Sequence, residues 1–140
     1  MRFMVLVPGG SESESGQMPP REALEEMTKY NQQLAEAGVF LAGEGLRPTS
    51  DGAKVRFEGE RPTVIDGPFT EAKEIVAGYW IWECSSREEA LEWLKRAPFA
   101  GGIEIELRPI FEAEDFGEQL TPELRDANRR LREQALSRNR

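Results

Sequence analysis

The chain has 140 residues, of which 39% are apolar and 31% are charged, a composition that is ordinary for a folded, water-soluble domain and excludes a disordered chain. No apolar run approaches the roughly 20 residues that a bilayer-spanning helix requires. The net charge is −8, with +3 on residues 121–140 and therefore −11 on the first 120, so the acidic body repels nucleic acid and anionic membrane.

The ionisable side chains exclude several kinds of chemistry. The chain has no histidine and a single cysteine, Cys84, so an internal disulfide is impossible and a zinc or copper site is not expected. Mechanisms that use a histidine base are also excluded. Any acid-base chemistry therefore uses Asp, Glu, Lys, Tyr or water. Cys84 follows an apolar strand, which favours a buried packing residue over a nucleophile. We expect a cytoplasmic protein with no metal or cofactor.

The first half of the chain predicts a strand, a helix and three further strands. Residues 2–7 are almost continuously apolar and predict a central strand, and the Gly/Ser/Glu-rich residues 8–17 predict a mobile surface loop. Apolar side chains at helical spacing predict a helix over 20–37, which Gly38 ends. Residues 39–42 predict a strand that runs into a bend at Gly43-Glu44-Gly45. Residues 54–57 and 63–65 alternate around a turn, as in a β-hairpin.

The second half repeats the strand and helix order. Residues 75–83 predict a strand in which Trp80 and Trp82 share a face. Ser86 with Glu89 three residues later is a capping box, which begins a helix that Pro98 stops. Residues 103–107 alternate apolar and charged side chains and predict a half-buried strand. The order β-α-β, hairpin, β-α-β predicts an α+β fold: a ferredoxin-like split βαβ with an inserted β-hairpin and both helices on one face of an antiparallel sheet.

Two features predict what covers the other face of this sheet and where the C-terminal tail forms a helix. Helices on one side cannot cover both faces, and we place Trp80 and Trp82 on the uncovered face, where a second subunit packs sheet against sheet. A tail helix is predicted to begin near Thr121 and Pro122, and its apolar stripe is too sparse to stand alone. We therefore expect a domain over residues 1–110 and a C-terminal extension with one helix over 111–140, in a homodimer.

One short motif resembles a known family. Asp66-Gly67-Pro68-Phe69, followed by Glu71, Lys73, Glu74 and Gly78, together with Ala42-Gly43-Glu44-Gly45-Leu46, resembles the DGPF subgroup of the YCII-related proteins. The resemblance covers residues 1–110 and implies a dimeric α/β barrel. In the wider group a His-Asp pair is proposed as catalytic. This chain has no histidine, so the resemblance leaves only Asp66, as the counterpart of the aspartate of that pair. Some DGPF members are linked to sigma factors of the extracytoplasmic-function type.

Six residues form the candidate site. Asp66, Glu44 and Lys73 are the catalytic candidates, because carboxylates beside an ammonium in a partly dry pocket can have their pKa values driven apart. The substrate-binding candidates are Arg47, Tyr79 and Glu74.

Four of these candidates also have a structural interpretation. Asp66 could accept hydrogen bonds from the turn amides while Pro68 fixes the turn and Phe69 fills the core. The charged run 71–74 could be a solvated turn of helix, and Arg47 a surface arginine.

Two functions follow from these residues. The first is a cofactor-independent enzyme that uses carboxylate acid-base chemistry on a small polar metabolite. The second is a non-catalytic ligand-binding or regulatory dimer, with a link to sigma-factor regulation implied by the resemblance. No nucleic-acid or membrane partner is expected.

Overall fold

The computed structural model describes residues 1–69 and 75–138, which fall into two compact units, Met1–Pro109 and Ile110–Arg140. The elements of the first unit are, in chain order, β1 (Arg2–Pro8), α1 (Ser11–Glu14), α2 (Arg21–Glu36), β2 (Phe40–Gly45), η1 (Thr49–Asp51), β3 (Ala53–Glu58), β4 (Arg61–Asp66), β5 (Val76–Glu83), α3 (Arg87–Lys95) and β6 (Glu106–Pro109). The second unit contains the 3-10 segment η3 (Ala113–Gln119) and the helix α4 (Pro122–Arg138).

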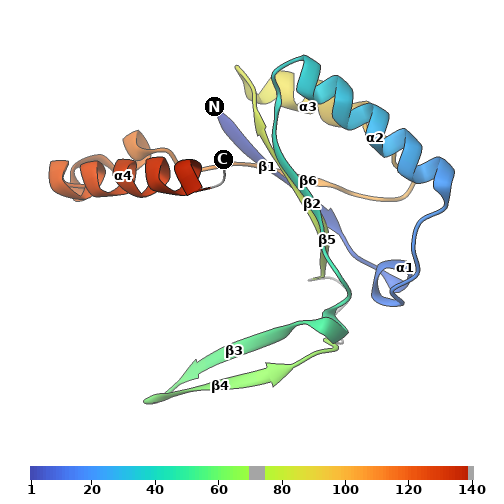
Figure 1. Ribbon diagram of the computed structural model, residues 1–140, viewed down its shortest axis with the longest axis horizontal. Coiled ribbons are helices and arrows are strands. Elements are labelled where there is room, and N and C mark those ends of the chain that lie inside the picture. The colour runs from blue at the N-terminus through green and yellow to red at the C-terminus, as the bar shows by residue number, and fades with distance from the viewer. Residues whose placement is uncertain (70–74, 139–140) are drawn as a thin grey trace. The chain divides into compact units, whose positions relative to one another are not determined.

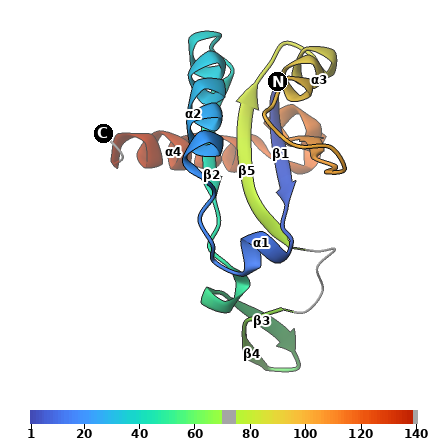
Figure 2. The same ribbon diagram turned by 90° about the vertical axis from the view of Figure 1, so that its right-hand side faces the viewer.

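Four strands form one antiparallel sheet in the order β2-β5-β1-β6. β1 and β2 run the same way with β5 inserted between them, which is the split βαβ arrangement. Helices α2 and α3 both lie on one face of this sheet (Figure 1, Figure 2). The α+β fold predicted from the sequence is therefore confirmed, including the separate hairpin of β3 and β4.

Local signals set the helix ends. The Ser86 hydroxyl accepts a hydrogen bond from the Glu89 amide at 3.1 Å, so the predicted cap of α3 is present. Gly38 has φ +74°, the left-handed conformation that follows a helix end at low cost only in glycine. In the second unit the Thr121 hydroxyl accepts from the Leu124 amide at 3.3 Å, which confirms the predicted start of the tail helix.

The core lies between the sheet and the helices, and it corrects one prediction. Its fully buried side chains are Phe3, Val5, Leu34, Trp82 and Ala90, and Trp80 is 5% exposed. The tryptophans therefore face α2 and α3, and their placement on the uncovered face was wrong. Strand periodicity shows which residues share a face, and it carries no information about which face the helices cover.

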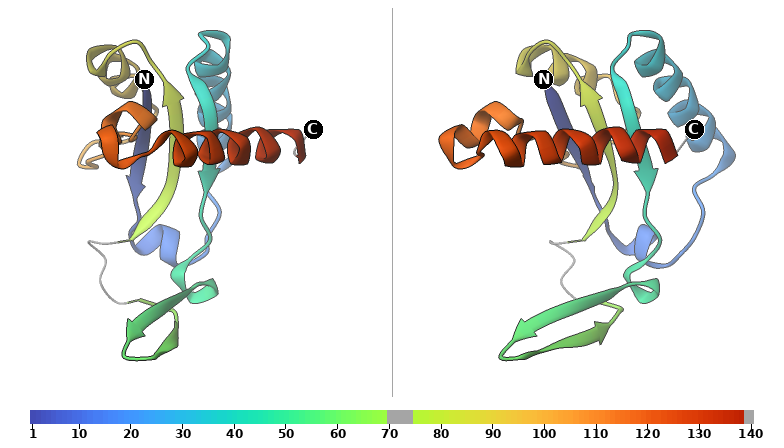
Figure 3. Two further views of the ribbon diagram at one scale, coloured as in Figure 1. Left: turned by 90° about the vertical axis from the view of Figure 1, so that its left-hand side faces the viewer. Right: turned by 60° about the vertical axis from the view of Figure 1, so that its left-hand side comes forward.

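The face of the sheet away from α2 and α3 is turned towards the viewer in Figure 3. By register, Glu44, Tyr79, Leu6 and Glu106 form one row across the four strands, and Ala42, Ile81, Met4 and Arg108 form the next. Two apolar side chains of β1 and two side chains of β5 thus lie between the edge strands, where Glu44, Glu106 and Arg108 are charged. We call this surface the open face.

Both edges of the sheet are irregular. β6 has four residues, ends at Pro109 and pairs with β1 from Phe3 to Leu6. The strand predicted over residues 103–107 therefore begins later, at Glu106. At the other edge, the pairing of β2 with β5 shifts register between Phe40 and Ala42.

The segment over residues 8–17 is more ordered than predicted. Ser11–Glu14 form the short helix α1, and Ser13 and Gly10 exchange hydrogen bonds at 2.8 and 3.0 Å. The prediction of a loop throughout this segment was wrong, because serine and glutamate at these positions cap a helical turn as well as they solvate a loop.

Candidate functional site

Glu44 and Tyr79 are the two predicted site residues that the structure brings together. They are directly opposite each other on β2 and β5. Side chains at such positions lie on the same face with Cβ atoms about 5 Å apart. The Glu44 side chain is exposed and makes no hydrogen bond or ion pair with residues 1–69 or 75–138. An unpaired carboxylate beside a phenol is therefore present on the open face.

Asp66 lies on the other sheet, at the end of β4 and opposite Ala53. The amides that follow it are bound elsewhere: the Gly67 N–H donates to the Gly52 carbonyl and the Phe69 N–H donates to Thr49 Oγ1, each at 3.0 Å. Within the described part of the chain, the Asp66 carboxylate accepts no hydrogen bond. The structural interpretation of Asp66 as the acceptor for these two amides is therefore wrong.

Thr49 is the residue that holds this turn, and sequence reasoning missed it. Its amide donates to the Glu14 carboxylate at 3.1 Å, and its hydroxyl also donates to that carboxylate while accepting from Phe69. Gly67 packs against the same backbone, since a Cβ at position 67 would lie 1.7 Å from the Thr49 carbonyl oxygen. α1, η1 and the turn after β4 are therefore tied together at one residue.

The remaining predicted site residues lie apart from Glu44 and Tyr79 or outside the described part. Arg47 Nε is 3.1 Å from the Asp51 carboxylate, and its side chain is 85% exposed. Lys73 and Glu74 lie outside the described residues. Phe69 is absent from the core and lies beneath the Lys54 ammonium, 4.4 Å from the ring centre, so its predicted role in the core was wrong.

A pocket of about 360 Å³ opens on the other side of the sheet, between α2 and the strands. We call it the helix-side pocket. Its side-chain walls are Val7, Pro19, Met27, Asn31, Trp80 and Phe99, and its remaining lining comes from residues 43–45 and 77–79. Because Glu44 and Tyr79 alternate with Gly43 and Trp80, they border this pocket with their backbone and direct their side chains to the open face.

Glycines and one amide define the helix-side pocket. A Cβ at Gly78 would lie 3.0 Å from the Glu44 carbonyl oxygen, whereas a Cβ at Gly45 would meet nothing within 4 Å. Asn31 Oδ1 accepts from Trp80 Nε1 at 2.9 Å, which fixes the amide and leaves its NH₂ group without a described partner. The pocket therefore offers apolar walls, a hydrogen-bond donor and open space above Gly45.

The comparison with protein families matches residues 1–114 to the YCII-related domain. The chain belongs to this family.

Two known proteins are similar to this YCII-related chain. An uncharacterized protein of Rhizobium meliloti (strain 1021) is 30% identical over 91 residues, which are 62% of this chain and 72% of the relative. The solved structure of 5-chloro-2-hydroxyhydroquinone dehydrochlorinase from Burkholderia phenoliruptrix AC1100, in complex with 2,5-dihydroxybenzoquinone, covers 82% of this chain and 98% of its own, with a TM-score of 0.45 and 16% identity.

Two further ionisable groups of the YCII-related domain are buried and neutral at pH 7. The Tyr30 hydroxyl donates to the Trp93 carbonyl at 2.6 Å, and burial raises the pKa of Tyr30. Burial also raises the pKa of the Cys84 thiol to about 11, with a smaller contribution from the Glu89 carboxylate. Cys84 is 3% exposed, as predicted for a packing residue, so neither group offers a nucleophile at neutral pH.

In the described ranges, no three histidine, cysteine or acidic side chains gather where they could hold a metal ion. No helix in those ranges is both long and apolar enough to span a bilayer.

Proposed function

We propose that this YCII-related protein binds a small, largely apolar molecule in the helix-side pocket. The observation that carries the proposal is the open space above Gly45, in a pocket whose volume falls in the range of about 300–1,000 Å³ typical of ligand sites. Glycine at positions 43, 45 and 78 keeps this space clear of side chains.

The chemistry of the walls supports a ligand class. Trp80 and Phe99 supply aromatic surface, with ring centres 6.0 Å apart, and Met27 supplies an adaptable apolar side chain. The Asn31 NH₂ group is the donor that a ligand can use. We expect an uncharged, mainly apolar ligand with one oxygen acceptor, because no ionised side chain among the described lining residues is directed into the pocket.

A second candidate function is the carboxylate enzyme. The pairing of Glu44 with Tyr79 on the open face supports it, because an unpartnered carboxylate can accept a proton while the neighbouring phenol positions a substrate oxygen. In this candidate, Asp66, Lys73, Glu74 and Arg47 keep the roles predicted from the sequence. The geometry supports it less well, since Asp66 lies on a different sheet from Glu44.

We further propose that the protein is a cytoplasmic homodimer of the DGPF subgroup, with two open faces packed together. Met4, Leu6 and Ile81 on that face support the dimer, because apolar side chains grouped on one face of a sheet favour a partner. The turn of Asp66–Phe69 supports the subgroup assignment. The link to sigma-factor regulation stays a prediction that follows from the resemblance.

A screen of neutral aromatic carbonyl compounds by thermal unfolding tests ligand binding. A ligand at 100 times its Kd stabilises the fold by about 2.7 kcal/mol, a shift of several degrees for a chain of this size. We expect Gly45→Val to abolish the shift, because the new side chain fills the pocket, and the matched control Gly101→Val to retain it, because Gly101 lies outside the pocket in open space.

The same screen separates the two functions. A compound that shifts the melting temperature of Gly45→Val as much as that of the wild type contradicts binding in the helix-side pocket. Mass spectrometry of each incubated compound then tests catalysis: conversion by the wild type that Glu44→Gln loses favours the enzyme, and retained compound favours the binding protein.

A further inference from the structure

The helix-side pocket contains one polar side chain whose orientation a neighbour fixes. Trp80 Nε1, on β5, donates to Asn31 Oδ1, on α2, at 2.9 Å. An indole N–H can only donate, so the atom of the Asn31 amide that meets it must be the oxygen. The NH₂ group then lies on the other branch of the same planar amide.

The Trp80 indole is itself held on several sides. It is 5% exposed, and the rings of Tyr30, Trp82 and Phe99 lie 5.7–6.0 Å from it, centre to centre. Gly43 lets the indole lie close to β2, since a Cβ at position 43 would be 2.7 Å from Trp80 Cδ1 and 3.1 Å from Trp80 Nε1. The indole N–H therefore keeps one place in the pocket wall.

This fixed N–H decides which group Asn31 offers to a ligand. An amide that is free to flip presents either its NH₂ group or its oxygen. A flipped Asn31 would set its NH₂ group against the Trp80 N–H, and a buried donor left without an acceptor is costly. Asn31 is half-buried and lines the pocket, and its NH₂ group has no partner within residues 1–69 or 75–138. The group left for a ligand is therefore one that only donates.

We propose that Trp80 is a positioning residue which, through Asn31, makes the helix-side pocket select ligands with a hydrogen-bond acceptor over ligands of similar shape with only a donor. The apolar frame of the ligand contributes affinity whatever its polar group is, and the fixed amide supplies the discrimination. This inference deepens the proposed ligand binding and rests on it.

Three neutral bicyclic compounds test the selection. 1-Indanone carries a carbonyl oxygen, indane is the same ring frame without that oxygen, and indole carries an N–H donor. We expect 1-indanone to bind the wild type about fivefold tighter than indane or indole, because one hydrogen bond of ordinary net strength corresponds to about that factor. NMR titration of the backbone amides of residues 43–45 and 77–79, which line the pocket, measures the three affinities.

Asn31→Asp reverses the polarity of the group that faces the ligand. One carboxylate oxygen still accepts from Trp80, and the other replaces the NH₂ group with an acceptor. We expect indole to bind this variant about fivefold tighter than 1-indanone. Gln32→Glu is the matched control, because it makes the same change of amide to carboxylate at the next position of α2, where the side chain is exposed and outside the pocket. It is expected to keep the wild-type preference.

Trp80→Phe tests the positioning role. Phenylalanine keeps an aromatic ring in the wall but removes the N–H, so the Asn31 amide is free to turn either group to the ligand. We expect 1-indanone and indole to bind this variant equally, within about a factor of two. Lost packing alone would weaken all three compounds together and leave their ratio unchanged. Trp93→Phe makes the same exchange on α3, outside the pocket, and is expected to keep the wild-type ratio.

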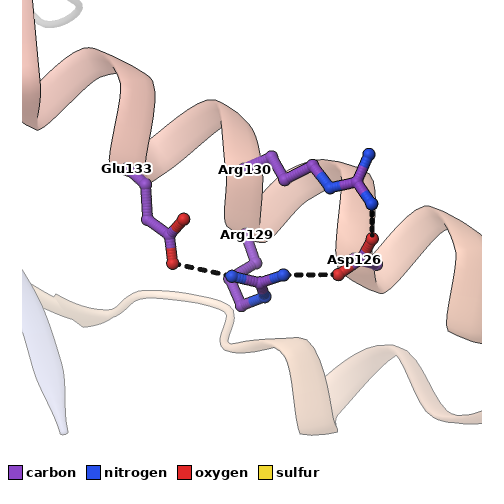
Figure 4. A network of polar contacts seen from close by, with 4 residues as sticks. All are labelled: Asp126, Arg129, Arg130 and Glu133. Carbon is purple, nitrogen blue, oxygen red and sulfur yellow. Dashed lines mark hydrogen bonds and ion pairs between the residues drawn. The ribbon is translucent and has the colours of Figure 1, made fainter.

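A second pocket requires a control of its own. Within the tail unit, η3 and α4 line a pocket of about 660 Å³. Its wall includes Arg129, which is 2.6 Å from Asp126 and 2.7 Å from Glu133 in the ion-pair network of α4 (Figure 4). A probe that binds in this second pocket keeps its affinity in Gly45→Val and in Asn31→Asp, because neither position lines it.

The outcomes separate this inference from the proposed function. If none of the three compounds binds the wild type, or if Gly45→Val binds them as well as the wild type does, the proposed site is overturned and the inference with it. Compounds that Gly45→Val loses but that the wild type binds with equal affinity overturn only the selection. A preference for 1-indanone that persists in Trp80→Phe overturns the role of Trp80. A preference that Asn31→Asp reverses and Trp80→Phe removes supports the inference.

Discussion

Replacement of Gly67 by alanine is the sharpest test of how the turn after β4 is held. The new Cβ would lie 1.7 Å from the Thr49 carbonyl oxygen and 2.6 Å from its carbonyl carbon, whereas real Cβ atoms essentially never come closer than 3.0 Å to such neighbours. The obstacle is backbone, so no rotamer change relieves it. The turn and η1 must separate by about 1.3 Å, the difference between 3.0 and 1.7 Å.

The cost follows from the contacts that this movement breaks. The Gly67 amide loses the Gly52 carbonyl and the Phe69 amide loses Thr49 Oγ1, at about 1 kcal/mol each. Residual overlap costs a further 1–3 kcal/mol or so. We expect Gly67→Ala to lower the free energy of unfolding by about 3 kcal/mol, a large share of the roughly 5–15 kcal/mol of an ordinary domain.

Urea denaturation followed by circular dichroism measures this loss, and hydrogen exchange of the Phe69 amide detects a turn that detaches while the core stays folded. Gly52→Ala is the matched control, because its Cβ would make an ordinary 3.5 Å contact with the same Thr49 oxygen. We expect the control to stay within about 1 kcal/mol of the wild type. Gly67→Ala with wild-type stability and unchanged Phe69 protection would refute the reasoning.

Two further predictions concern Thr49 and Cys84. Thr49→Val keeps the shape of the side chain but removes the hydroxyl between Glu14 and Phe69. We expect the free energy of unfolding, measured by urea denaturation, to fall by about 1–3 kcal/mol in Thr49→Val and to stay near the wild-type value in Thr49→Ser. Equal stability of all three proteins contradicts the role of the hydroxyl. Burial raises the pKa of Cys84 from 9.0 to about 11, so the folded state holds this proton to higher pH than the unfolded state. The free energy of unfolding is therefore expected to fall as pH rises from about 9 to 11, by up to about 1.4 kcal/mol per pH unit, and less steeply in Cys84→Ala. Above pH 10 the raised pKa of Tyr30 adds to the fall in both proteins. Identical slopes in wild type and Cys84→Ala contradict the assignment to the thiol.

The elements that the sequence predicted well are those with local causes. Ser86 and Gly38 mark helix ends through contacts within a few residues, and the alternating residues 54–57 and 63–65 around a turn were sufficient to predict a hairpin. The face occupied by Trp80 depends instead on which side α2 and α3 pack, and the start of β6 depends on where its pairing with β1 begins. Both depend on contacts between residues far apart in the chain, which no local sequence pattern encodes.

The candidate site likewise combines residues that local sequence indicated with contacts that only the fold creates. Glu44 and Tyr79 were both named from the sequence, but their position opposite each other follows only from the register between β2 and β5. Thr49 was missed because its partners Glu14 and Phe69 are 35 and 20 residues away in the chain. The helix-side pocket was also missed, although the glycines at 43, 45 and 78 were a signal for open space once the strands were aligned.

The irregular edges of the four-stranded sheet have a consequence for aggregation. A long, flat edge strand is a template to which another chain can add by backbone hydrogen bonds. Here one edge is the four-residue β6 ending at Pro109, and the other is interrupted by the register shift between Phe40 and Ala42. Both features disfavour edge-to-edge aggregation by strand addition, as short and bulged edges do in other β-proteins. The four-stranded sheet therefore offers another chain little regular edge to extend.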